Sequence, residues 1–148
     1  MTSLSRSVLA ASVGRPAYSQ SFPCEPSTAE IGRRFVREVL GVWHLDNLAD
    51  RAALVVTELI ANAVRHTPCH EIRLIVGRPT GTRVRIGVVD RAPWCLPTLG
   101  QADDEDESGR GLFLIDAVAD GWGYDLHGSA GHPWAKEVWA ELRVKGDE

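Results

Sequence analysis

Glu58, Asn62 and His66 form the chemically most informative set in the sequence, because they recur at every fourth position of an otherwise largely apolar stretch. Side chains at this spacing lie along one row of an α-helix. A carboxylate in such a row can take a proton from a hydroxyl or a water molecule, and an amide oxygen suits Mg²⁺. Two interpretations stay open: a row that faces a binding cleft, or a solvated helix edge with an i,i+4 hydrogen bond.

A second set, Ser108-Gly109-Arg110-Gly111-Leu112, combines two glycines and an arginine at the start of a predicted helix. The free amides and the dipole at a helix N-terminus attract anions, and glycines let a ligand approach the backbone closely. The pattern indicates either a phosphate site or a flexible hinge that leads into the helix. Arg110 would add positive charge to the first and would be solvated in the second.

Apolar spacing and turn residues predict the elements that position these two sets. Ser27 and Glu30 have the spacing of a capping box at the start of the first helix. The predicted helices run from Ser27 to about Trp43, from Asp46 or Asn47 to the residues before Pro68, and from Gly109 to Ala119. The predicted strands are Tyr18–Cys24, a hairpin over Glu71–Asp90, Gly121–Leu126 and Trp134–Val144.

This order of elements predicts an α+β fold. Helices on one face of a mostly antiparallel mixed sheet would make a two-layer α/β sandwich. Residues 18–144 are expected to form the domain, with a long lid loop at 91–108, and residues 1–17 and 145–148 are expected to be tails. Loops as long as 91–108 are usually functional or disordered.

Composition narrows the class of function. The formal net charge of −4 over 148 residues argues against a nucleic-acid-binding domain. The sequence lacks an apolar run long enough to cross a membrane. Its three cysteines are odd in number and widely spaced, which indicates a reduced, cytoplasmic protein without a disulfide framework.

Four segments match, in order, the motifs of one known family. They are Glu58–His66 for ELxxNAxxH, Asp90 at a strand end, Gly109–Gly123 for GRGLxLI…ADxWG, and Lys136–Ala140 for KTVWA. Together they resemble the ATP-binding module shared by gyrase, heat-shock chaperones, histidine kinases and mismatch-repair ATPases (the GHKL type). Within that type, the sequence is most similar to the anti-sigma-factor serine kinases. The resemblance covers about residues 18–143, and the joint occurrence of the motifs favours the functional interpretation of both polar sets.

The resemblance implies ATP and Mg²⁺ as cofactors and gives roles to particular residues. Glu58 would be the general base, and Asn62 would be a Mg²⁺ ligand. Asp90 would accept a hydrogen bond from the adenine amino group, which guanine lacks at that position. Further nucleotide contacts would come from His66, Gly109, Arg110, Gly111 and Leu112.

Two positions depart from the motifs of the family. The usual DxGxG is Asp90-Arg91-Ala92-Pro93-Trp94 here, without either glycine, and the threonine of KTVWA is replaced by Glu137. In relatives that threonine helps to hold adenine through water. The resemblance therefore places Glu137 beside the adenine pocket.

The expected activity is a serine kinase that phosphorylates a small protein of the anti-sigma-antagonist type and sequesters a sigma factor. The alternative from another class is a module that holds a transcription regulator without phosphorylating it, with or without a nucleotide. Plain ATP hydrolysis is a third interpretation. The expected partners are proteins rather than nucleic acid or membrane, and a homodimer is left open.

Overall fold

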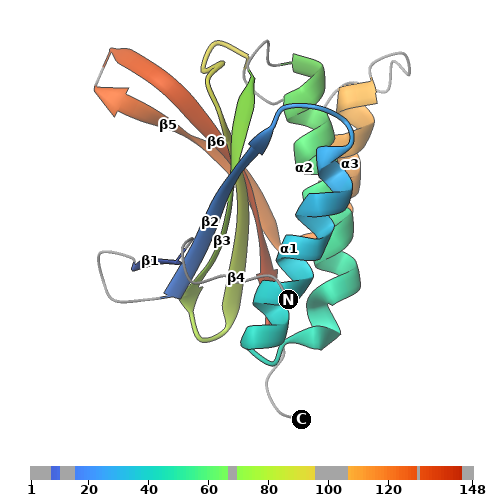
Figure 1. Cartoon of the computed structure of the whole chain (residues 1–148). Coiled ribbons are helices and arrows are strands. Elements are labelled where there is room, and N and C mark those ends of the chain that lie inside the picture. Colours follow the sequence, from blue (N-terminus) through green and yellow to red (C-terminus); the bar gives the residue numbers. More distant parts are fainter. Residues whose placement is uncertain (1–7, 11–15, 67–69, 96–106, 130, 145–148) are drawn as a thin grey trace.

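Helices pack on one face of a six-stranded sheet, which confirms the predicted two-layer α+β architecture (Figure 1). The computed structural model describes residues 8–10, 16–66, 70–95, 107–129 and 131–144. The strands are β1 (Val8–Ala10), β2 (Pro16–Pro23), β3 (Glu71–Thr80), β4 (Arg83–Asp90), β5 (Gly121–Ser129) and β6 (His132–Arg143). The helices are α1 (Thr28–Val42), α2 (Ala49–His66) and α3 (Glu107–Val118), with a 3-10 turn η2 (Asp46–Leu48) before α2.

The sheet has the order β1-β2-β3-β4-β6-β5, and each of these neighbouring pairs is antiparallel. The parallel pair that a mixed sheet requires is therefore missing among the described strands. The β4–β6 register sets Asp90 opposite Lys136 and Val89 opposite Glu137. Because side chains alternate between the faces of a sheet, the first pair faces the helices and the second pair faces away from them.

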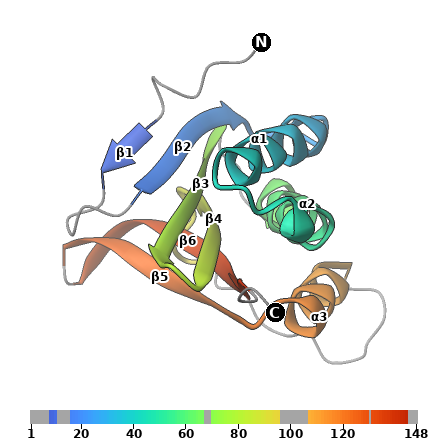
Figure 2. The same cartoon turned by 90° about the horizontal axis from the view of Figure 1, so that it is seen from below.

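The core lies between the helices and the inward-facing side chains of β2, β3, β4 and β6, and α2 is the helix that contacts both other helices (Figure 2). Phe22 of β2 meets Phe35 of α1 edge to face, with ring centroids 6.0 Å apart. A methyl group at Gly32 would collide with Ile60, so the glycine permits the close approach of α1 to α2. This packing fixes α2 against the sheet along its apolar face.

The predicted helix caps are wrong. Ser27 precedes α1 but has helical dihedral angles, φ −65° and ψ −17°, and makes no capping hydrogen bond. A capping residue normally has extended angles that direct its oxygen back to the helix amides. The Ser27 hydroxyl donates instead to the Glu25 carboxylate at 3.0 Å. Asp46 and Asn47 lie inside η2, so neither of them is the N-cap of α2.

Several element boundaries also differ from the predictions. Strand β1 lies within the predicted N-terminal tail and pairs with β2, and β5 and β6 form a longer hairpin than predicted. Helix α3 begins at Glu107, inside the predicted lid loop, and residues 96–106 of that loop lie outside the described part of the chain. Among the described helices, none is both long enough and apolar enough to cross a membrane.

Candidate functional site

The elements that carry the predicted site residues meet at one end of the sandwich, the upper end in Figure 1. Helix α2 ends there at His66, strand β4 ends there at Asp90, and α3 begins there at Glu107. Helix α2 packs against both α3 and β4. The tertiary structure thus gathers three segments that are well separated in the sequence.

The polar row of α2 lies on the side of that helix that faces α3. Arg51, at the beginning of α2, donates two hydrogen bonds of 2.6 and 3.2 Å to the carbonyl oxygen of Val118 at the end of α3. At about 100° per residue, Glu58 and Asn62 lie within about 20° of Arg51 around the helix. Because α3 runs opposite to α2 in Figure 1, these two residues lie toward the beginning of α3.

Glu58 and Asn62 have no hydrogen-bond or ion-pair partner among the described residues. Glu58 is half-buried, and Asn62 is only 9% exposed. The i,i+4 hydrogen bond expected of a solvated helix edge is not formed between them. Neither residue is among the described side chains with a fully buried polar atom that lacks a partner, so both polar groups reach the surface and can contact a ligand there. The side chain of His66 lies outside the described part of the structure.

The start of α3 differs from the prediction in a way that affects the phosphate site. Because the helix begins at Glu107, Gly109 is its third residue and keeps a free amide, whereas the amide of Gly111 is bonded within the helix. The side chain of Leu112 is 1% exposed and belongs to the core, so it lines no surface site. The side chain of Arg110 is outside the described residues. Of the two glycines predicted to bind phosphate, only Gly109 thus keeps an amide that is free to bind an anion.

Asp90 is buried at the end of β4 and is bound by Lys136, a partner that the sequence analysis did not assign. The Lys136 ammonium donates to both carboxylate oxygens, at 2.8 and 2.9 Å, and to the carbonyl oxygen of Ala92 at 2.9 Å. The backbone amide of Ala92 donates to Asp90 Oδ1 at 2.8 Å. Asp90 and Lys136 are 2% and 1% exposed. The three residues form a closed unit, which we call the Asp90–Lys136–Ala92 cluster.

The turn after β4 lies where the family motif DxGxG has its two glycines. Ala92 and Pro93 are buried, and Trp94 is exposed. The alternating pattern of β6 could have identified Lys136 as an inward-facing residue, because it shares its face of the strand with the core residues Val138 and Ala140. An inward-facing lysine in such a strand must have a buried acceptor.

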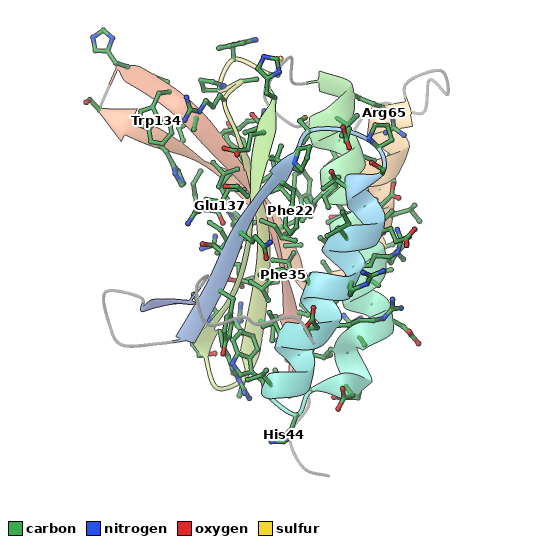
Figure 3. The ribbon with its side chains drawn as sticks, viewed as in Figure 1. Phe22, Phe35, His44, Arg65, Trp134 and Glu137 are labelled. Atoms are coloured by element: carbon green, nitrogen blue, oxygen red, sulfur yellow. The ribbon has the colours of Figure 1, made fainter. Side chains whose placement is uncertain are left out.

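The expectation that Glu137 lies beside the adenine pocket is wrong. Its carboxylate lies over Gly87 on the sheet face turned away from the helices (Figure 3), opposite to the face of Asp90. His127 Nε2 lies 3.4 Å from Glu137 Oε1, and the neighbouring Arg85 guanidinium stacks 4.0 Å from the ring centroid of Trp139. Burial raises the pKa of Glu137 above its usual value, against the opposing effects of Arg85 and His127.

Glu137→Gln should remove a pH dependence of stability. Because the pKa of Glu137 is raised in the folded chain, the wild type should lose stability as the pH rises from the ordinary Glu pKa through the raised value. The variant should not show this loss, and its advantage should be largest above that interval. Urea denaturation between about pH 4 and pH 8 measures this. Glu141→Gln, on the same face of β6, is the control; parallel curves for wild type and Glu137→Gln would contradict the prediction.

Comparison with known proteins shows the family of this chain. The family model of the histidine kinase-like ATPase domain matches residues 22–132, so the chain belongs to that family, and membership implies an ATP-binding domain. An uncharacterized protein of Streptomyces coelicolor is 43% identical over 77 residues, which are 49% of this chain and 70% of that protein. The name of this relative states no activity, so the roles of individual residues stay predictions.

Proposed function

We propose that this chain is a Mg-ATP-dependent serine kinase that phosphorylates a small protein of the anti-sigma-antagonist type and sequesters a sigma factor. The observation that carries the proposal is the pair of unpartnered groups on α2, Glu58 and Asn62, which lie toward the start of α3. The family membership over residues 22–132 supports a nucleotide as the ligand between them.

Each group has a distinct task in this proposal. The Glu58 carboxylate takes the proton from the attacking serine hydroxyl. The Asn62 amide oxygen fits a Mg²⁺ ligand, because it is uncharged, accessible and without a protein partner among the described residues. The free amides of the first turn of α3, including that of Gly109, attract the phosphates. When bound, Mg²⁺ supplies charge stabilisation to the transferred phosphoryl group.

ATP should bind more tightly than GTP if Asp90 recognises the base. The adenine amino group donates a hydrogen bond to a carboxylate, and guanine presents an acceptor at the same position. A lost hydrogen bond to a charged group costs about 1.5 to 3 kcal/mol, so the affinities should differ by about tenfold or more. Isothermal titration of the wild type with Mg-ATP and Mg-GTP measures this difference. Equal affinities would overturn the adenine assignment, and no binding of either nucleotide would overturn the proposed kinase.

The Asp90–Lys136–Ala92 cluster favours a second candidate function, because it leaves the expected adenine acceptor already in use. This candidate is a module that holds a transcription regulator without phosphorylating it. The two functions are separated by incubating the protein with labelled ATP and with small regulatory proteins encoded by neighbouring genes. Transfer of label to a serine supports the kinase. Formation of a stable complex without transfer supports the holding module, and release of phosphate without a protein acceptor indicates hydrolysis.

A further inference from the structure

The Asp90 carboxylate has almost no capacity left for an incoming hydrogen-bond donor. A carboxylate accepts about four hydrogen bonds, and Asp90 already accepts two from the Lys136 ammonium and one from the Ala92 amide. The remaining acceptor position is covered, because the residue is 2% exposed. A purine amino group can reach this carboxylate only after one of its present partners moves.

We propose that Lys136 is an internal competitor for the adenine amino group at Asp90 and thereby sets the nucleotide affinity of the site. The ammonium occupies the donor position on Asp90, and ATP binds at Asp90 by displacing it. This inference rests on the proposed function, since it assumes that the nucleotide uses Asp90.

Lys136 is the partner that can move. Its charge sits at the end of a flexible four-carbon stem and is strongly hydrated outside the protein, whereas Ala92 is a fully buried backbone segment followed by the buried Pro93. The charge-assisted hydrogen bonds of the ammonium to Asp90 are stronger than those of a neutral amino group, so its displacement opposes ATP binding. The wild type should therefore bind ATP weakly, and weaker competition at Asp90 should raise the affinity.

A graded series of substitutions at Lys136 tests the competition. Lys136→Met removes the ammonium at similar length and should bind ATP about tenfold or more tightly than the wild type. Lys136→Gln keeps a neutral, shorter donor and should lie between them. The double variant Asp90→Asn/Lys136→Met should bind ATP no more tightly than Asp90→Asn, because the gain requires the carboxylate. Circular dichroism and urea midpoints identify any variant that does not fold, and Lys136→Gln carries the test if Lys136→Met fails.

The sequence offers a second test that needs no substitution, because Lys136 and Lys145 are its two lysines. In protein labelled with ¹⁵N only at lysine side chains, the buried Lys136 ammonium should give a resolved NMR signal. Saturating ATP should shift or abolish this signal, and GTP at the same concentration should leave it in place. Lys145 is the internal control for changes in pH and ionic strength.

The outcomes separate this inference from the proposed function. A rise in affinity through the series together with a displaced Lys136 signal supports both. If the wild type binds ATP but folded Lys136→Met binds it equally or more weakly, or if the Lys136 signal is unchanged, the competition is overturned and the proposed function stands. If neither the wild type nor any Lys136 variant binds ATP, both are overturned.

Discussion

Glu58→Gln should bind Mg-ATP with the affinity of the wild type and transfer phosphate about 100-fold more slowly or worse. Glutamine keeps the size of the side chain but cannot take the proton from the attacking hydroxyl. Because Glu58 has no partner among the described residues, the substitution breaks no internal ion pair and should leave the fold intact. Titration calorimetry measures the binding, and transfer of labelled phosphate to the partner protein measures the reaction.

The matched control is Glu30→Gln, the same chemical change on the exposed side of α1, where Glu30 pairs with Arg34 at 3.7 Å. This control should transfer phosphate at the rate of the wild type. Glu58→Gln with a wild-type rate would remove Glu58 as the general base. Loss of ATP binding in Glu58→Gln would instead give this residue a role in holding the nucleotide or its Mg²⁺.

Lys136→Met should lower the free energy of unfolding by about 3 to 5 kcal/mol in the absence of nucleotide, because it leaves the buried Asp90 carboxylate without its counter-ion. Asp90→Asn should be destabilising for the corresponding reason, since it leaves a buried ammonium. The double variant Asp90→Asn/Lys136→Met removes both charges and should recover most of the loss. The amide oxygen that Asp90→Asn introduces can still accept from the Ala92 amide. Urea denaturation of the four proteins measures the coupling.

A control for this cycle is the exposed ion pair between Arg37 and Asp50, whose atoms are 3.7 Å apart. Removal of either partner there should change stability by no more than about 1 kcal/mol. If the losses of the two single variants at Asp90 and Lys136 simply add in the double variant, the pair is not coupled, and the account of the Asp90–Lys136–Ala92 cluster is wrong.

The sequence by itself determined the class of the fold and predicted a set of candidate site residues whose roles stay predictions. Helices and strands are encoded by local periodicity, so the helix that carries Glu58 and Asn62 and the hairpin that ends at Asp90 could be predicted from neighbouring residues alone. Motifs in the correct order predicted the histidine kinase-like ATPase family, which the family match over residues 22–132 confirms.

Only the tertiary structure decided which of these groups are free and which are already bound. Lys136 meets Asp90 across 46 positions of the chain, and this contact depends on the register of two strands. The same register turns Glu137 to the opposite face, away from the position that its motif suggested. A shift of one residue would exchange the two side chains. Strand register is set by long-range packing. For this reason, the sequence alone could not predict that Asp90 is bound by Lys136 or that Glu58 has no partner among the described residues.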